Sequence, residues 1–234
     1  EQDLLEVRRV IESGAFSMAF QPICDLESGE IHHYEVLARI DGKEGSPFAF
    51  IQAAEEMGLI KDFDRAMCRK VVRWLNERNS EGNAFSVAVN LSALSVEDEG
   101  FMISLDILLE KHKHLREQIM FELTESARIE DPRAANTALQ RLRGVGHKVC
   151  LDDFGVGESS LQDLRQFQVD LVKIDGSYVR DALENSVNYH ILRAVAQLCT
   201  DLGIATVAEM VEEEPVREFL VECGVRFGQG YLLG

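Results

Sequence analysis

The sequence is poor in basic residues: it has 24 Lys and Arg against 41 Asp and Glu, which gives a net charge of −17 over 234 residues. A chain without a basic stripe cannot neutralise a phosphate backbone, so the composition argues against binding of a nucleic-acid polymer. It also argues against direct contact with an anionic membrane surface. A small anionic substrate remains compatible with this charge if metal cations lie between it and the acidic residues.

Proline, linker-like segments and long apolar runs are also scarce. The chain has four prolines, no Gly/Ser-rich or Pro-rich stretch, and no run near eighteen consecutive apolar residues. We therefore expect a single domain over residues 1–234, without a membrane-spanning helix or signal peptide. Because the sequence starts at Glu1 and stops at Gly234, we expect this domain to be excised from a longer multidomain protein. The expected location is cytoplasmic, although the parent protein could be membrane-anchored.

The cysteines are odd in number and lack a C-x-x-C pair, which argues against disulfides and against a zinc site. Most of them lie inside apolar runs, as expected for small buried residues in a reducing compartment. The five are Cys24, Cys68, Cys150, Cys199 and Cys223.

Short β-rich runs alternate with helical periodicity along most of the chain. A leading helix is expected at 2–12, followed by a hairpin that turns at Glu27–Gly29. Eight strands are expected in all, and six of them follow a βαβα rhythm that requires right-handed crossovers in a parallel sheet. This count and length predict an α/β fold: a TIM-like (β/α)8 barrel with one early antiparallel strand. An open doubly wound sheet is the alternative, but no G-x-G-x-x-G follows the first strand.

Nearly every expected strand finishes in a polar side chain suited to catalysis or metal binding. In a barrel the carboxyl ends of parallel strands converge on one rim, where active sites are built. One such residue alone is more often a helix cap or a turn residue, but seven strands with the same feature are hard to explain as caps. The residues are Glu35, Asn90, Glu122, Asp152, Asp153, Lys173, Asp175, Glu209 and Gln229.

The chemistry of this set favours hard divalent cations. Five carboxylates on one rim would repel one another unless cations lay among them. Carboxylate and amide oxygens suit Mg²⁺ or Mn²⁺ rather than zinc, and none of the six histidines falls at a strand end. Two cations bridged by a shared carboxylate form the usual clamp for in-line attack on phosphorus. A lysine among these anions should stay protonated, because they favour its charged form.

Eight segments, in order from residue 20 to 232, carry a family resemblance. They are FQPI, EVLAR, VNLS, FELTES, LDDFG, VKIDG, AEMVE and QGYLL. Together they resemble the signature blocks of the EAL-domain cyclic di-GMP phosphodiesterases, bacterial signal-transduction hydrolases. The resemblance implies a reaction in which water, activated by two Mg²⁺ or Mn²⁺ ions, opens cyclic di-GMP to linear pGpG. It also implies a homodimer, and sensor or cyclase-like domains elsewhere in the parent protein.

The resemblance also assigns roles to individual positions. It makes Glu35, Asn90, Glu122 and Asp152 ligands of one metal, and Asp152, Asp153 and Glu209 ligands of the other. Lys173 is similar to the lysine that holds and helps activate the attacking water, and Asp175 supports it. The expected substrate contacts are Gln21, Leu37, Arg39 and Gln229, and Arg39 offers a fork of donors to a phosphate oxygen. Glu125 resembles the glutamate that steadies the loop after Asp153.

The chain departs from the family pattern in three places. Glu158 replaces a tyrosine in the loop after the paired aspartates, Met210 replaces the glycine of A-E-G-V-E, and the stretch after Arg39 is short. None of these removes a metal ligand, but a ligand displaced by about 1 Å can lower the rate a hundredfold. The alternative hypothesis is therefore a catalytically weak or inactive domain that binds cyclic di-GMP and signals to another domain; a structural role ranks third.

Two other signals carry little weight. Asp153-Phe154-Gly155 spells the kinase D-F-G motif, but no glycine-rich loop or H-R-D precedes it, so Phe154 is expected to pack below the rim. His32 and His33 are adjacent in an expected strand, where side chains alternate between faces, so both are not expected to ligate one metal.

Overall fold

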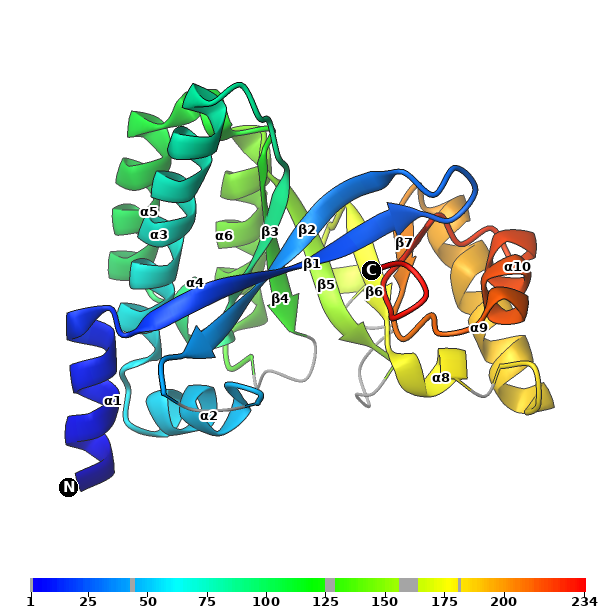
Figure 1. Ribbon diagram of the computed structural model, residues 1–234, viewed down its shortest axis with the longest axis horizontal. Helices are drawn as coiled ribbons and strands as arrows, with labels where there is room; N and C mark the ends of the chain where they lie inside the picture. Colours follow the sequence, from blue (N-terminus) through cyan, green and yellow to red (C-terminus); the bar gives the residue numbers. More distant parts are fainter. Residues whose placement is uncertain (1, 43–44, 125–128, 156–163, 181) are drawn as a thin grey trace.

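A computed structural model describes residues 2–42, 45–124, 129–155, 164–180 and 182–234. Its strands form one closed barrel in the sequence order β1 to β8 (Figure 1). β1 is antiparallel to both β2 and β8, whereas every other neighbouring pair from β2 to β8 is parallel. The predicted barrel with one early antiparallel strand is confirmed, and the open doubly wound sheet is excluded.

The strands are β1 Phe16–Asp25, β2 Ile31–Ile40, β3 Val87–Leu91, β4 Ile119–Thr124, β5 Lys148–Phe154, β6 Leu171–Ile174, β7 Ala205–Ala208 and β8 Phe227–Gly228. The longer helices are α1 Gln2–Ser13, α2 Phe48–Glu56, α3 Ile60–Ser80, α5 Glu99–Lys111, α6 Pro132–Gly144, α9 Ser186–Asp201 and α10 Glu214–Glu222. Shorter ones are α4 Ala93–Val96, η1 Lys113–Leu115 and α8 Gly176–Arg180.

Side chains that cap helices explain several of these boundaries. The carboxylate of Asp98 accepts a hydrogen bond from the backbone N–H of Phe101 at the start of α5. Asp131 does the same at α6, and Asn185 at α9. Each cap satisfies backbone donors that the first turn of a helix leaves free, which typically contributes about 1 kcal/mol.

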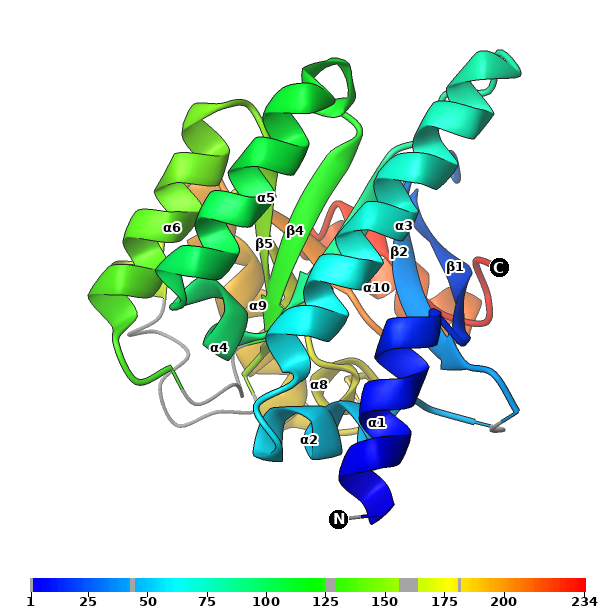
Figure 2. The same cartoon turned by 90° about the vertical axis from the view of Figure 1, so that its left-hand side faces the viewer.

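Two apolar clusters lie outside the barrel wall and one lies inside it. The largest packs β2 to β5 against the helices from α1 to α6, and Figure 2 shows α3, α5 and α6 along this side. A second packs the β6–β8 side against α8, α9 and α10. The interior cluster takes one residue from each of seven strands: Ile23, Ala88, Met120, Cys150, Leu171, Val207 and Phe227.

This interior cluster determines where the polar side chains lie. Successive residues of a strand face opposite sides, so the residue two positions further on faces the barrel interior again. Starting from the six members of the cluster on β3 to β8, that step reaches a polar residue on the same strand or directly after it. The six reached are Asn90, Glu122, Asp152, Lys173, Glu209 and Gln229. The apolar cluster is thus the floor beneath a polar layer near the carboxyl ends of the strands.

The structure corrects the expectation for His32 and His33. Cys24 of β1 pairs with Ile31 and Ile23 pairs with His33, so His32 is the extra residue of a β-bulge. The bulge breaks the alternation of faces and brings the two Nδ1 atoms within 2.7 Å of each other. The argument that the two imidazoles point apart was therefore wrong. Among the described residues, however, no group of three or more potential metal ligands includes either histidine.

Other expected boundaries differ in detail. The apolar run VRFGQGYLL predicts a last strand over 225–233, but β8 has only two residues. The short helices α4 and α8 were not expected, because four or five residues are too few to show a helical period. The pattern SSLQDLRQF predicts a helix over 159–167, and most of that range lies outside the described residues. Phe154 is buried beneath the rim as expected.

Candidate metal centre

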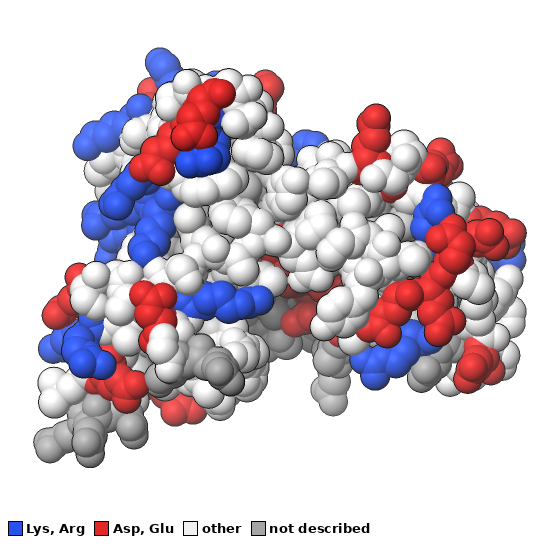
Figure 3. Space-filling model, in the orientation of Figure 1, with Lys and Arg blue, Asp and Glu red and all other residues white. Residues whose placement is uncertain are grey.

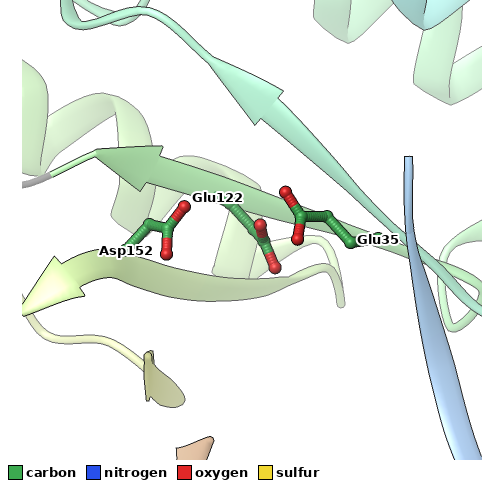
Figure 4. A group of neighbouring side chains, drawn as sticks. All are labelled: Glu35, Glu122 and Asp152. Atoms are coloured by element: carbon green, nitrogen blue, oxygen red, sulfur yellow. The ribbon is translucent and has the colours of Figure 1, made fainter. Parts of the chain in front are cut away.

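Carboxylates from β2, β4 and β5 and from the residue after β7 meet in the polar layer of the barrel, and Figure 3 shows acidic side chains in the recess near the middle of the face that it draws. Glu35, Glu122 and Asp152 form one group, and their carboxylate oxygens point toward a common centre in Figure 4. A second group consists of Asp152, Asp153 and Glu209, so Asp152 belongs to both. Within each group, one ligand atom per residue lies within 4.8 Å of the others. The structure therefore brings together every carboxylate that the sequence predicted as a metal ligand.

Lys173 of β6 lies at the centre of this layer and is 1% exposed. Its ammonium nitrogen is 2.9 Å from Asp152, 3.1 Å from Glu35, 3.1 Å from Glu209 and 3.6 Å from Glu122. Burial alone would lower the pKa of Lys173, but the four surrounding carboxylates outweigh it and raise this pKa well above its ordinary value. The lysine is thus a fixed positive charge at neutral pH, as the sequence predicted.

Glu35 is held by two neutral side chains as well as by the lysine. Asn90 donates to its Oε1 at 3.1 Å and Gln229 donates to its Oε2 at 2.8 Å. Burial would raise the pKa of Glu35, but the charge of Lys173 and these hydrogen bonds hold this pKa below its ordinary value. Because Asn90 uses its amide N–H on Glu35, its carbonyl oxygen remains as a possible cation ligand.

Glu122 shows most directly that these residues fit a cation. The residue is 1% exposed, and both of its carboxylate oxygens are buried without a hydrogen-bond partner among the described residues. Burial and the neighbouring carboxylates raise its pKa well above the ordinary value, although Lys173 opposes them. A buried carboxylate without donors is costly unless a cation meets its oxygens. The oxygen-rich set therefore fits a hard divalent cation.

The second group is more open than the first. Asp153 is partly buried, and burial together with Asp152 raises its pKa to about 6. Burial raises the pKa of Glu209 to about 7, although Lys173 opposes the shift. The backbone of Asp153 is left-handed, with φ 57°, and its N–H donates to the carboxylate of Asp152 at 2.9 Å. This turn lets two adjacent aspartates contribute to the same group.

The predicted substrate contacts lie around the first group. Gln21 of β1 is paired in register with Glu35, and Leu37 follows two residues further along the same face of β2. Arg39 continues this face, half-buried, and donates to the carbonyl oxygen of Ala38 at 2.8 Å. The structure thus places these side chains in a row that leads away from the carboxylates.

The remaining predictions have mixed outcomes. The carboxylate of Asp175 accepts a hydrogen bond from the N–H of Ser177 at 2.9 Å, and among the described residues no hydrogen bond joins it to Lys173. Glu125 and Glu158 lie outside the described residues. Met210 directly follows Glu209 and has a left-handed backbone, φ 55°, a conformation that suits the glycine expected there.

A closed α/β barrel with two groups of carboxylate side chains at the carboxyl ends of its strands is a barrel protein with a candidate divalent-cation centre. The chain matches the family model described as EAL domain over residues 5–234 and belongs to that family. It is 33% identical over 231 residues to cyclic di-GMP phosphodiesterase PdeF of Escherichia coli, covering 97% of this chain and 31% of that protein. It is 32% identical to cyclic di-GMP phosphodiesterase PdeB of Shewanella oneidensis, covering 98% and 27%. The chain thus spans about a third or less of these relatives.

Among solved structures, the chain is similar to the PaMucR phosphodiesterase in complex with c-di-GMP. The TM-score is 0.84 at 31% identity, and the match covers 100% of this chain and 96% of that one. It is also similar to the FimX EAL domain from Pseudomonas aeruginosa bound to c-di-GMP, with a TM-score of 0.85 at 27% identity and coverage of 98% and 94%. Among the described residues, no helix is long and apolar enough to cross a membrane.

Proposed function

We propose that this chain is a divalent-cation-dependent phosphodiesterase that opens cyclic di-GMP to linear pGpG. The observation that carries the proposal is the pair of carboxylate groups that share Asp152 around the buried Lys173. The EAL family membership and the relatives named as cyclic di-GMP phosphodiesterases support the substrate.

Most side chains of the centre would bind the cations, and Lys173 would orient the attacking water. Glu35, Asn90, Glu122 and Asp152 would hold one cation, and Asp152, Asp153 and Glu209 the other, with Mg²⁺ or Mn²⁺ preferred by the all-oxygen set. When bound, the two ions supply Lewis-acid activation of water and neutralise charge on the phosphoryl group. Lys173 remains protonated, so it acts as a donor that orients the attacking water and stabilises the transition state rather than as a general base.

The row beside the centre would bind the substrate. The guanidinium of Arg39 offers several donors to a phosphate oxygen, and Gln21 presents an amide beside Glu35. Leu37 provides an apolar contact between them, and Gln229 fixes Glu35 while lining the site. We assign Asp175 a supporting role through α8, which it caps, and Glu125 a supporting role in the loop after Asp153.

The proposal is tested by incubating the purified chain with cyclic di-GMP and Mg²⁺ or Mn²⁺ and separating the nucleotides by chromatography. We expect pGpG with either ion and none after chelation. Glu35→Ala should abolish the product, because it removes a ligand of the first cation. If full activity survived that change, the assignment of the centre would be wrong.

The second candidate is a domain that binds cyclic di-GMP without cleaving it. The left-handed Met210 next to Glu209 favours it, because a methionine there departs from the glycine of the family pattern. Tight binding of cyclic di-GMP with no pGpG under either ion would favour this sensor over the enzyme.

Other properties of the parent protein are inferred from the family. We infer that residues 1–234 are one domain of a longer multidomain protein, because the chain spans 31% and 27% of two relatives. A homodimer, sensor or cyclase-like domains in the parent and a cytoplasmic location also remain predictions. Gel filtration with light scattering tests the homodimer.

A further inference from the structure

Two non-glycine residues adopt a left-handed backbone in the described part of the chain. Both belong to, or directly adjoin, the second group of candidate ligands: Asp152, Asp153 and Glu209. Asp153 is a member of that group, and Met210 directly follows its member Glu209. Such a backbone costs on the order of 1–3 kcal/mol for a non-glycine residue and persists only where surrounding contacts impose it. The contacts that hold these two turns therefore also place the carboxylates.

Tyr178 of α8 holds the turn that leaves Asp153. Its hydroxyl donates a hydrogen bond of 2.6 Å to the carbonyl oxygen of Gly155, two residues after Asp153. A Cβ atom on Gly155 would lie 2.6 Å from Cε2 of Tyr178, so the ring lies directly against the glycine backbone. Gly155 itself has φ 108°, a backbone conformation that residues other than glycine rarely adopt.

Met210 connects the other turn to the first residue of the same helix. A Cβ atom on Gly176 would lie 2.3 Å from both Cγ and Sδ of Met210, so the methionine occupies the space that a side chain on Gly176 would need. At the end of α8, Nη2 of Arg180 lies 3.2 Å from Sδ of Met210 and donates to it. Met210 thus contacts both the first and the last residue of α8.

The helix that makes these contacts is itself tied to the strands. Asp175 donates its backbone N–H to the carbonyl oxygen of Phe154 at 3.3 Å and caps α8 through Ser177. Figure 1 shows α8 directly beyond the ends of β5 and β6. In the described part of the chain, no hydrogen bond joins α8 to Glu35 or Glu122.

We propose that α8 sets the separation of Asp153 and Glu209, with Tyr178 and Met210 as positioning residues for the second divalent cation. The inference rests on the proposed function, because it assumes that this group binds an ion. Residues that orient metal ligands typically change metal affinity 10–100-fold when they are replaced. Loss of either contact should weaken the second ion and leave the first one unchanged.

The test compares Tyr178→Phe with Tyr189→Phe. Tyr189 of α9 packs on the same apolar cluster as Tyr178 and stacks on Phe219, so its replacement removes a tyrosine hydroxyl from α9 and leaves that of α8 in place. Binding of Mn²⁺ is followed by the electron paramagnetic resonance signal of the free ion. We expect two ions in the wild type, a roughly tenfold weaker second ion in Tyr178→Phe, and no change in Tyr189→Phe. Hydrolysis by Tyr178→Phe should fall at low Mn²⁺ and recover at high Mn²⁺, with an unchanged KM for cyclic di-GMP.

A second pair of variants tests Met210. Gly176→Ala places a methyl group where Met210 lies, so it should displace the turn and weaken the second ion more than Tyr178→Phe does. Adding Met210→Gly removes the collision, so the double variant should bind the second ion more tightly than Gly176→Ala alone. Recovery in the double variant would show that the displacement passes through Met210.

The outcomes separate this inference from the proposed function. Equal Mn²⁺ affinities in the wild type, Tyr178→Phe and Gly176→Ala would overturn the inference even if all three cleave cyclic di-GMP. Two bound ions without hydrolysis, combined with weaker binding of the second ion in the two variants, would refute the proposed function and support the inference. A wild type that binds only one Mn²⁺ would overturn both.

Discussion

The ammonium nitrogen of Lys173 lies 3.6 Å from the nearer carboxylate oxygen of Glu122, beyond hydrogen-bonding distance. Both residues are almost fully buried, yet the lysine makes its shorter contacts to Glu35, Asp152 and Glu209. Glu122 thus feels the positive charge without receiving a hydrogen bond, and its two oxygens remain available to a cation. This relationship separates the electrostatic role of Lys173 from the proposed ligand role of Glu122.

The first prediction concerns Glu122→Gln, which keeps the shape of the side chain and removes its charge. We expect kcat/KM for cyclic di-GMP to fall about a hundredfold or more, because a neutral amide is a poor cation ligand. Without ions, the urea midpoint at pH 8 should be equal or higher, because the raised pKa of Glu122 makes its ionisation unfavourable to folding. A loss of activity accompanied by unfolding would contradict this prediction.

The second prediction concerns pH and the removal of divalent ions. Burial raises the pKa of Glu209 from 4.5 to about 7 and that of Asp153 from 3.8 to about 6. A raised carboxyl pKa favours the folded state below the ordinary value, and this contribution is lost as the pH rises through the folded value. In chelator, the urea midpoint should therefore fall between pH 4 and 8. Saturating Mg²⁺ should reduce this fall, because the ion binds the folded, ionised site. Identical slopes with and without Mg²⁺ would refute the prediction.

The third prediction concerns Asp64, a buried residue of α3 whose Oδ2 accepts hydrogen bonds from Ser95 Oγ at 2.6 Å and Ser92 N–H at 3.0 Å. Burial raises the pKa of Asp64 from 3.8 to about 7, and the nearby Glu55 adds to the shift. Its contribution to stability should be present below pH 3.8 and lost as the pH approaches and passes 7. The expected loss is on the order of 4 kcal/mol at most.

Asp64→Asn removes the titrating group and should flatten this part of the pH dependence. The pH dependence due to Asp64 should not respond to Mg²⁺, whereas that due to Glu209 should. The reason is that α3 supplies no side chain to either group of candidate metal ligands. Urea denaturation of the variant and the wild type at several pH values, each with and without Mg²⁺, separates the two parts. Parallel pH profiles for the two proteins would show that Asp64 does not titrate in this range.

The fourth prediction concerns Lys173→Met, which removes the positive charge from among four carboxylates. Without ions at pH 8, we expect a loss of roughly 3–5 kcal/mol in the free energy of unfolding, because the buried carboxylates lose their counter-charge. Hydrolysis should fall at least about a hundredfold, even at saturating Mn²⁺, because no donor then orients the water. Lys148→Met is the control, since Lys148 is exposed at the start of β5 and should tolerate the change. Retained activity in Lys173→Met would show that the lysine is only structural.

Much of the centre could be predicted from the sequence because it depends on strand periodicity. A polar residue such as Glu122 or Asp152, two positions after an apolar interior residue, must face the interior near the end of its strand. The cation chemistry followed from the residue types alone. The family resemblance added the substrate contacts, whose roles stay predictions.

Other features could not be predicted, because they arise only when the barrel closes. The bulge at His32 depends on the register between β1 and β2, and no local pattern indicates it. The contact of Tyr178 with Gly155 joins residues 23 positions apart through a helix too short to show a period. The sequence shows Met210 where the family pattern has glycine, but its position over Gly176 depends on the tertiary structure.

The two-residue strand β8 closes the barrel, and its pairings with both neighbouring strands are short. It pairs with β1 only through Cys24 and Asp25, and with β7 only through Val207 and Ala208. Gln229, which donates to Glu35, directly follows this junction. β8 thus has the shortest strand pairings of the barrel. The backbone amides of β8 should therefore exchange with solvent before those of β3 to β5. Local opening of β8 would release the hydrogen bond from Gln229 to Glu35, so an opening of the barrel wall would also free a proposed cation ligand.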